Sequence, residues 1–395
     1  MTPPSSGFST RAVHGAAMPP VGQRPASVPI YQTSTWGFED SDMFAGVISL
    51  EEHGYAYGRG YGNPTVDALE SVAADLESCE AAFGFSSGMS AITAVCLTLA
   101  GAGGRILASR ELYGGTYAFF HDVAPRLGLQ VVMVDPHDLT AVAGALPGAA
   151  LFYAETIANP LCTVADLGAL AELCKHAGVP SVVDNTFASP WLCRPSELGV
   201  DVVIHSTTKY LAGHSDVIGG VACSSNQVRK AIRETAIDIG GAMQPFDAWL
   251  TIRGIQTLEL RLERQCSSAA RLAEVLAAQP GVERVHYPGL WDHPQHAVAA
   301  RLFRPGNFGG MLSVEIAGGV DKAKAWCDSL ELAWIGASLG GTHTLIAHPA
   351  STTHRQMSPE ARRELGLSDG LVRVSVGIED YDDLVSDVMQ AFTKI

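Results

Sequence analysis

The chain has 395 residues, of which 47% are hydrophobic and 17% are charged, and its net charge at pH 7 is −15. This composition is that of an ordinary soluble globular protein, and the length is enough for two domains or for one large domain with a smaller cap. The negative charge argues against nucleic acid and acidic membranes as main partners, and no apolar run reaches transmembrane length.

The eight cysteines are predicted to be reduced thiols of a protein core. They contain no C-x-x-C pair, and Cys96, Cys174 and Cys223 lie inside apolar runs. Small buried thiols of this kind fit a cytoplasmic protein, whereas disulfide frameworks and metal sites need other spacings. Residues 1–15 contain no apolar signal-peptide core. We therefore expect a cytoplasmic location, no disulfides and no metal site.

The first 60 residues are rich in Gly, Pro and Ser and show little periodicity. Within them, residues 29–35 are predicted to form an extended arm that either lies disordered or wraps a neighbouring subunit. The glycines and aromatic rings of residues 55–65 predict a tight loop around Arg59. This loop is either a Gly-rich turn with a surface arginine or a phosphate clamp, because arginine binds phosphate bidentately. A helix is expected to begin at Asn63, with Pro64 in its first turn.

Residues 86–90 read Ser-Ser-Gly-Met-Ser and precede an apolar, helix-like run that ends at Leu99. Ser and Gly are ordinary capping residues at a helix start. Small residues there also leave N–H groups and the positive end of the helix dipole open to an anion. This stretch alone favours the capping role.

Strand and helix signals alternate from residue 105 to residue 205. Apolar runs predict strands at residues 105–108, 130–134, 150–153, 181–183 and 201–205. Helices are predicted at residues 117–127 and 166–176, the second with Asp166 as its cap. This alternation predicts an α/β protein with a mostly parallel sheet that helices cover on both faces. Polar residues follow the strand ends, namely Tyr113, Glu155, Asn159, Asp184, Ser206 and Lys209.

The most informative stretch is Ser206-Thr207-Thr208-Lys209, directly after the last of these strands. Open α/β sheets bind ligands at the carboxyl ends of their strands. In extended chain the hydroxyls of Ser206 and Thr208 share a face that can hold a phosphate. Asp184 ends the neighbouring strand, and a carboxylate buried there needs a partner. A lysine, an aspartate and a phosphate cradle together indicate pyridoxal phosphate (PLP), although a lone lysine in this place is more often a solvated rim residue.

Beyond these strands the pattern changes. Residues 248–278 predict one long amphipathic helix that connects two domains. Residues 311–316 and 371–376 alternate like half-buried strands of a smaller α/β domain, with Arg373 on the polar face of its strand and available to a carboxylate. The predicted division is an extended N-terminal arm at 1–60, a PLP-binding large domain at 61–250 and a small C-terminal domain at 251–395.

Taken together, these motifs resemble the Cys/Met-metabolism family of PLP-dependent enzymes. The resemblance runs from residues 10–14 to residues 372–379 and is densest from Asp184 to His214. The family includes cystathionine γ-synthase, cystathionine γ-lyase, methionine γ-lyase and O-acetylhomoserine sulfhydrylase. It implies the aspartate-aminotransferase-like fold of type I PLP-dependent transferases. It also implies a homotetramer, a dimer of dimers, whose active sites are shared between subunits.

The same resemblance implies a role for each candidate residue. Lys209 would form the Schiff base with PLP, Asp184 would keep the pyridine nitrogen protonated, and Tyr113 would stack on the ring and act as an acid or base. Asn159 would bond the ring hydroxyl. Phosphate contacts would come from Gly88, Met89, Ser206 and Thr208, and across the subunit interface from Tyr57 and Arg59. The substrate, an amino acid, would meet Ser338, Arg373 at its α-carboxylate, Glu155 and His343.

Four features depart from one branch of the family or another. Three residues separate Arg59 from Asn63 where the family usually has two, which leaves the register of the phosphate clamp open by one residue. Gly115 stands where methionine γ-lyases usually carry a cysteine and is more typical of cystathionine enzymes. His343 stands where cystathionine enzymes commonly carry a glutamate at the distal end of their substrate. Residues 348–354 look like the sulfhydrylase branch.

The predicted activity is a PLP-dependent γ-elimination on methionine or cystathionine that gives 2-oxobutanoate, ammonia and a thiol. Without the distal glutamate, a short apolar substrate is favoured over cystathionine. The alternative is a γ-replacement enzyme, either cystathionine γ-synthase or an O-acetylhomoserine sulfhydrylase. A non-catalytic PLP-binding protein is a third class, and no missing site residue favours it.

Overall fold

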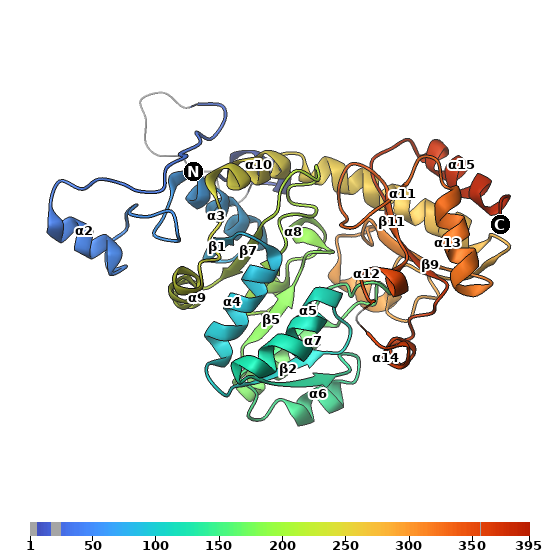
Figure 1. Cartoon of the computed structure of the whole chain (residues 1–395), viewed down its shortest axis with the longest axis horizontal. Coiled ribbons are helices and arrows are strands. Elements are labelled where there is room, and N and C mark those ends of the chain that lie inside the picture. The colour runs from blue at the N-terminus through green and yellow to red at the C-terminus, as the bar shows by residue number, and fades with distance from the viewer. Residues whose placement is uncertain (1–5, 17–24, 356) are drawn as a thin grey trace.

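The computed structural model describes residues 6–16, 25–355 and 357–395. Within these residues the fold is α/β with two sheets, one of seven strands and one of five. In Figure 1, α10 (Pro245–Ile255) lies over the first sheet and α11 (Leu258–Ala277) leads toward the C-terminal part. The expected class, a large sheet with a second, smaller α/β unit, is confirmed.

The seven-stranded sheet is mixed, with most of its described strands parallel. Its order is β1-β7-β6-β5-β4-β2-β3, and only β7 runs antiparallel to its neighbours, β6 and β1. The bounds are β1 Ala81–Phe85, β2 Arg105–Ser109, β3 Gln130–Val134, β4 Leu151–Glu155, β5 Ser181–Asp184, β6 Val202–His205 and β7 Gly220–Ser224. The five strands predicted from apolar runs are the five adjacent parallel strands.

Helices cover both faces of this sheet because alternate residues of its strands are apolar on both sides. One core contains α3 (Pro64–Glu77), α7 (Leu167–Ala177) and the strand residues Leu107, Phe152, Val183 and Val203. The opposite core contains α4 (Gly88–Ala100), α9 (Asn226–Ile239) and the strand residues Ile106, Leu151, Val182 and Val202. The shorter helices are α5 (Gly114–Ala118), η1 (Phe119–Val123), η2 (Ala124–Leu127), α6 (Leu139–Ala145), α8 (Ser189–Leu192) and η3 (Pro195–Leu198).

The predicted starts of α3, α4 and α7 are confirmed by their caps. The side chain of Asn63 accepts from Thr65 N, and Pro64 occupies the first turn of α3. Ser87 caps α4 and Asp166 caps α7 in the same way. Each cap satisfies an N–H group that has no partner inside its helix.

The prediction of a regular helix at residues 117–127 is wrong, both in the residue at which the helix begins and in the kind of helix. Helical turns begin at Gly114 in α5, widen into the π-helical turn η1 and end in the 3-10 turn η2. Pro125 lies in the first turn of η2. A proline cannot donate a hydrogen bond, and its ring clashes with the carbonyl four residues earlier, so a regular helix cannot continue through it.

The single helix predicted at residues 248–278 is also wrong, because it is broken between α10 and α11. Arg261 donates to the carbonyl of Gly254 at 2.7 Å and to that of Tyr210 at 2.9 Å. A Cβ at Gly254 would lie 2.0 Å from Ala212 O, so the backbones meet closely there. The end of α10 is thus bonded to other parts of the chain, although the apolar periodicity continues past it.

The second sheet has the order β10-β11-β12-β9-β8, and only β10 and β11 pair in parallel. Its strands are β8 Val282–His286, β9 Met311–Ile316, β10 Trp334–Ile335, β11 Leu345–Ala347 and β12 Leu371–Ser375. Its helices are α12 (His296–Leu302), α13 (Gly319–Ser329), η4 (Pro349–Ser351), α14 (Pro359–Glu364) and α15 (Tyr381–Phe392). Every residue of β12 is buried, so the prediction of a half-buried strand is wrong. One face packs on α11, α13 and α15, and the other faces the first sheet.

The N-terminal segment is only partly extended. It contains α1 (Phe8–His14), which packs on α3, and α2 (Ser41–Ile48), which projects from the body in Figure 1. Residues 25–39 contain no helix, and Thr35 pairs with Tyr57 in an isolated bridge. Residues 1–5 and 17–24 of the predicted arm lie outside the described residues. The division at residues 60 and 250 stays a prediction, and residue 250 falls inside α10.

Candidate active site

A cavity of about 1020 Å³ lies between the carboxyl ends of the parallel strands and the second sheet. Twelve of the fourteen candidate residues line it, and the other two are Tyr57 and Arg59. Asp184 ends β5 and Lys209 follows β6, whereas Ser338 and Arg373 come from the C-terminal part. The two sheets therefore each supply one side of the cavity.

The amine of Lys209 lies inside this cavity. Its Nζ donates to Ser338 Oγ at 2.8 Å. Burial, and then the nearby Arg373 guanidinium, lowers the pKa of Lys209 to about 8, although Asp184 acts in the opposite direction. Because an ordinary lysine has a pKa near 10.4, a much larger fraction of Lys209 is uncharged at neutral pH. An uncharged amine can act as a nucleophile or a base.

Asp184 is a carboxylate in need of a cation. Its Oδ1 accepts from Thr186 N at 2.9 Å, and burial raises the pKa of Asp184 above its ordinary value. None of the Lys, Arg or His groups among the described residues forms an ion pair with it. A protonated ring nitrogen would fit, because it would supply the missing positive charge and favour the ionised carboxylate.

The start of α4 meets the Ser206 loop at the cavity, in an arrangement suited to an anion. A Cβ at Gly88 would lie 2.8 Å from the Cβ of Ser206, so the helix start and the Ser206 loop approach as closely as they do because residue 88 is glycine. The first N–H groups of α4 have no partner inside the helix. Ser206 and Thr208 line the same cavity, and the Thr208 hydroxyl also accepts from Gly219 N at 3.0 Å. N–H groups at a helix start together with hydroxyls suit an anion.

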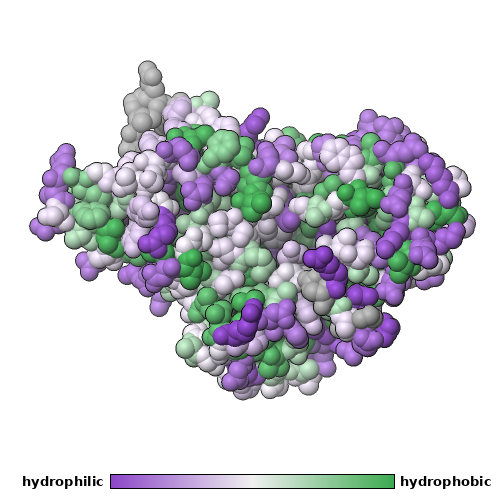
Figure 2. Space-filling view, viewed as in Figure 1, coloured by the Kyte–Doolittle hydropathy of each residue, from purple (hydrophilic) through white to green (hydrophobic). Residues whose placement is uncertain are grey.

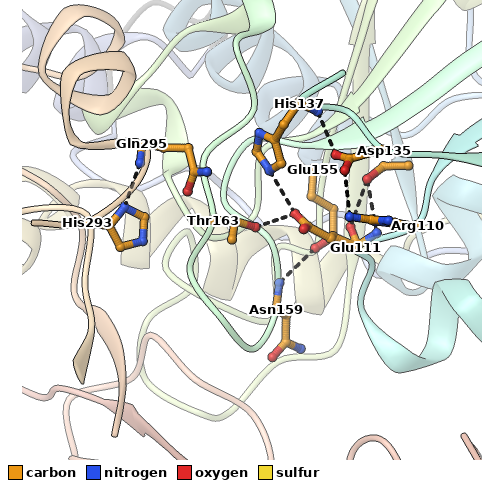
Figure 3. Close-up of polar contacts among 10 residues, drawn as sticks. Arg110, Glu111, Asp135, His137, Glu155, Asn159, Thr163, His293 and Gln295 are labelled. Carbon is orange, nitrogen blue, oxygen red and sulfur yellow. Dashed lines mark hydrogen bonds and ion pairs between the residues drawn. The ribbon is translucent and has the colours of Figure 1, made fainter. Parts of the chain in front are cut away.

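Glu155 holds the backbone on which Tyr113 and Asn159 lie. Its Oε1 accepts from Tyr113 N at 2.6 Å and its Oε2 accepts from Asn159 N at 3.3 Å, as Figure 3 shows for Asn159. Burial, and then the charge of Asp184, raises the pKa of Glu155 well above its ordinary value. Both hydrogen bonds of Glu155 come from backbone N–H groups of site residues. They therefore support a role in positioning Tyr113 and Asn159 more than a direct contact with substrate.

Arg373 is a buried cation that has no carboxylate partner among the described residues. It is 3% exposed, and it donates to Asn159 Oδ1 at 3.3 Å and to Ser338 O at 2.9 Å. Its Nε and the Nδ2 of Asn159 are buried without a hydrogen-bond partner. Burial lowers the pKa of Arg373. A buried guanidinium with an open donor is suited to a carboxylate ligand.

Ser338 connects these two cations and has a strained backbone. Its φ is +78°, in the left-handed region that glycine normally occupies. Such a conformation costs about 1–3 kcal/mol and is found mainly at functional sites. In this conformation the Ser338 hydroxyl accepts a hydrogen bond from Lys209 while the Ser338 carbonyl accepts one from Arg373.

Tyr57 and Arg59 are not brought into the large cavity of their own chain. They line a separate hollow of about 450 Å³ together with residues 32–34 and 240. Arg59 Nη1 donates to Ile237 O, and Tyr57 is 46% exposed. The loop after Arg59 turns on Gly60 and Gly62, both with φ of +93°. The roles of these two residues in phosphate binding stay predictions.

The outer wall of the cavity is aromatic. His343 stacks on Trp334, with ring centroids 4.3 Å apart and an interplanar angle of 20°. Both rings line the cavity. Trp334 lies in a two-residue strand, which is too short for any periodicity, and its role at the site was not predicted. The same is true of Thr186, whose Oγ1 accepts from Ser206 N at 2.8 Å and whose only sequence signal is its place after β5.

A cluster of metal ligands and a membrane-spanning helix are both absent from the part of the chain that the structure describes. No group of three or more His, Cys, Asp and Glu residues there could hold a metal ion. No helix there is both long enough and apolar enough to cross a membrane. All eight cysteines lie in that part and are free thiols.

Comparison with known proteins places this geometry in one family. Residues 9–393 match the model of the Cys/Met metabolism PLP-dependent enzymes. The chain is 42% identical to L-methionine gamma-lyase of Pseudomonas putida, over 98% of this chain and 97% of that protein. It is 41% identical to cystathionine gamma-lyase of Bacillus subtilis (strain 168), over 98% and 99%. The solved structure of cystathionine gamma synthase from Xanthomonas oryzae pv. oryzae with aminoacrylate and cysteine gives a TM-score of 0.92 at 36% identity and covers 98% of both chains. The chain belongs to the Cys/Met-metabolism family of PLP-dependent enzymes.

Proposed function

We propose that this chain is a γ-lyase that acts on methionine or a related thioether such as cystathionine and gives 2-oxobutanoate, ammonia and a thiol. The observation that carries the proposal is that Lys209, Asp184 and Arg373 line one cavity. Arg373 has no carboxylate partner there among the described residues. An amine, a carboxylate and a guanidinium are the groups that PLP chemistry on an amino acid requires. Relatives named as methionine and cystathionine γ-lyases support this reaction class.

When bound, PLP makes the Cα proton of an attached amino acid acidic, because its protonated ring withdraws electrons. Asp184 would hold the proton on the ring nitrogen. Lys209 would anchor the cofactor and, after the substrate has replaced it there, would carry the proton away from Cα. A pKa of about 8 suits Lys209 to this work, because acid–base groups act best when their pKa lies near the working pH.

Substrate orientation would depend on Arg373 and Tyr113. Arg373 would bind the α-carboxylate, with its guanidinium oriented by Asn159 and by the Ser338 carbonyl. Tyr113 is 42% exposed at the cavity, and its phenol would donate a proton to the departing sulfur. Without proton donation the thiol would have to leave as a thiolate, which is a poorer leaving group near neutral pH.

The second candidate function is γ-replacement, in which a nucleophile takes the place of the leaving group. Residues 348–354 resemble the sulfhydrylase branch, and Thr353 of this stretch lines the cavity. The likeness in fold does not separate the two reactions, because a solved cystathionine gamma synthase and a solved cystathionine gamma-lyase both give a TM-score of 0.92. Elimination and replacement use the same residues up to the loss of the leaving group, so the two differ in what enters the cavity next.

Purified protein should be given methionine, cystathionine, or O-acetylhomoserine with a thiol, and the 2-oxo acid should be measured against any new thioether. We expect 2-oxobutanoate and ammonia in equal amounts from methionine. A new thioether with little oxo acid would assign the protein to γ-replacement. No turnover of any of the three would contradict an enzyme of this class.

We predict that His343→Glu shifts the preference toward cystathionine. The ammonium at the far end of cystathionine would meet a carboxylate in the variant, whereas methionine has only a methyl group there. Hydrogen bonds to charged groups contribute about 1.5–3 kcal/mol, so the kcat/KM ratio of cystathionine to methionine should rise roughly tenfold or more. Trp334→Phe keeps an aromatic wall and is the matched control. An unchanged ratio in His343→Glu would show that this position does not select the substrate.

The arm and the separate hollow support a site that is completed by a second subunit. Three apolar side chains of the projecting α2 are exposed, Met43 by 51%, Phe44 by 45% and Ile48 by 36%. Figure 2 shows hydrophobic residues gathered over this projection, at the left of the view. Exposed apolar groups on a projecting helix suit a protein partner. We propose a homotetramer, a dimer of dimers, in which Tyr57 and Arg59 reach the phosphate cradle of a neighbouring subunit.

Mixing inactive Arg59→Ala chains with inactive Lys209→Ala chains should restore activity. In a mixed dimer one of the two sites contains both an intact Arg59 and an intact Lys209, so up to about half of the sites in mixed dimers recover, as expected for a symmetric two-site dimer. Subunit exchange must be confirmed by native mass spectrometry. If exchange is complete and no activity returns, Arg59 acts within its own chain.

A further inference from the structure

Glu111 lies two residues before Tyr113 and has no part in the steps proposed above. Its Oε2 accepts from Thr163 Oγ1 at 2.5 Å and lies 3.1 Å from Nε2 of His137. The side chain of Glu111 is 16% exposed and that of His137 is 26% exposed. Figure 3 shows the three side chains converging. Loops that follow β2, β3 and β4 therefore meet at one carboxylate.

The turn that carries His137 is itself tied to the residue before Glu111. His137 N donates to Asp135 Oδ1 at 2.9 Å, and Asp135 Oδ2 accepts from Arg110 Nη2 at 2.6 Å. Arg110 N also donates to Val134 O at 2.9 Å. His137 consequently has little freedom to move away from Glu111, and the contact between them joins two anchored segments.

These contacts hold the chain on both sides of the Tyr113 loop. Glu155 holds Tyr113 N at 2.6 Å, and Glu111 holds the segment that enters the loop. Thr163 O accepts from Ala158 N at 2.9 Å, next to the Asn159 that Glu155 also binds. Tyr113 is 42% exposed, so the direction of its side chain depends on its backbone as well as on packing.

We propose that Glu111 and His137 are positioning residues for Tyr113, and that their contact, together with Thr163, keeps the phenol aimed into the cavity. The inference rests on the proposed role of Tyr113 in the γ-elimination. It assigns no direct contact with substrate to either residue.

The charges of this cluster make the positioning depend on pH. Burial opposes ionisation of Glu111, but the hydrogen bonds from His137 and Thr163 outweigh it and lower its pKa. The hydrogen bond to Glu111 raises the pKa of His137, and Asp135 adds to this, whereas burial and Arg110 oppose it. Glu155 is the other acidic group that faces Glu111. The pair is thus fully charged above the lowered pKa of Glu111 and loses the His137 charge as the pH rises through the raised pKa of His137.

The test compares wild type with His137→Gln, which keeps a hydrogen-bonding side chain but cannot be protonated. Near pH 7 the release of 2-oxobutanoate should fall about tenfold, within the ~10²-fold that a 1 Å misplacement can cost. Exchange of the Cα proton with deuterium and the absorbance of bound PLP should stay within about twofold of wild type, because they depend on other residues. The ratio of wild-type to variant rates should shrink as the pH rises through the pKa of His137. A ratio that does not change with pH would overturn the proposal.

A second variant and a matched pair control for folding. Glu111→Gln should lose as much activity as His137→Gln, because it removes the other charge of the same pair. His286 on the edge strand β8 and Glu315 on its neighbour β9 form a comparable pair at 2.6 Å, and their side chains are 12% and 14% exposed. His286→Gln should match His137→Gln in thermal stability and leave product release unchanged. Equal losses of product release in both His variants would overturn the proposal.

The double variant separates this inference from the proposed function. In a Tyr113→Phe background, His137→Gln should cost no further activity, because positioning a missing phenol has no value. If Tyr113→Phe is slow and His137→Gln alone is not, the inference fails while the proposed function stands. If Tyr113→Phe releases 2-oxobutanoate at the wild-type rate, the role of Tyr113 is wrong and the inference falls with it.

Discussion

Replacing Lys209 with alanine is expected to abolish both turnover and the yellow absorbance of lysine-bound PLP. The reason is that the only amine among the residues lining the main cavity of the described chain is that of Lys209. Its lowered pKa of about 8 makes it a better nucleophile at neutral pH than a lysine at the surface. Absorbance spectra and steady-state assays of the purified variant measure both effects.

Two controls make this result specific. Lys209→Arg keeps a positive charge in the cavity but cannot form the covalent link, so it should lose the same absorbance. Lys175→Ala removes an exposed lysine from α7 and should change nothing. A Lys209→Ala protein with wild-type absorbance and rate would remove Lys209 from its proposed role.

Asp184→Asn is expected to slow exchange of the substrate Cα proton by several powers of ten, where each ~1.4 kcal/mol of lost stabilisation is a factor of ten. The Asp184 carboxylate is half-buried at the cavity and forms no ion pair with a cation among the described residues. The amide of the variant has no negative charge with which to keep a proton on the ring nitrogen. The cofactor should still bind. Exchange is followed by NMR in deuterated solvent.

Asp201→Asn is the matched control for this prediction. Asp201 lies just before the opposite end of β6, where its Oδ2 accepts from Ser181 N and Oγ, both at 2.8 Å. Its replacement changes a carboxylate of the same sheet far from the cavity and should leave exchange unaffected. Exchange at the wild-type rate in Asp184→Asn would show that the carboxylate does not support the electron-withdrawing ring.

The large sheet was predictable because its parallel strands are buried on both faces. Continuous apolar runs such as Val202–His205 mark these strands, and the polar residue after each run marks the ligand-binding edge. β1 and β7 escaped prediction because they consist largely of small residues, including Gly84 and Gly220, with few β-branched side chains. They form the antiparallel side of the sheet, where the start of β7 pairs with the end of β6.

The second side of the cavity could not be worked out from strand patterns. Ser338 was named through family resemblance, and Arg373 was singled out on the polar face of a strand that was expected to be half-buried. Arg373 is buried, and it contacts Asn159 in the loop that follows β4 of the first sheet, a contact that no local pattern encodes. Glu155 likewise accepts hydrogen bonds from the backbone N–H groups of Tyr113 and Asn159. These contacts form only when the loops after β2 and β4 fold together.

The contacts of the Glu111–His137 pair illustrate the same limit. These two residues are 26 positions apart in the chain and meet because β2 and β3 are parallel neighbours with adjacent carboxyl ends. The order of strands in a sheet does not follow from the apolar runs themselves. Side-chain partners at the ends of neighbouring strands therefore become visible only in the folded chain.

The most direct test of the proposed active site is to map the lysine to which PLP is covalently attached. Purified protein loaded with PLP should be reduced with borohydride, digested, and mapped by mass spectrometry. The account predicts a pyridoxyl phosphate group on Lys209, in the peptide that follows β6. Labelling of another lysine, such as Lys175 or Lys230, in place of Lys209 would contradict the assignment of the cavity as the active site.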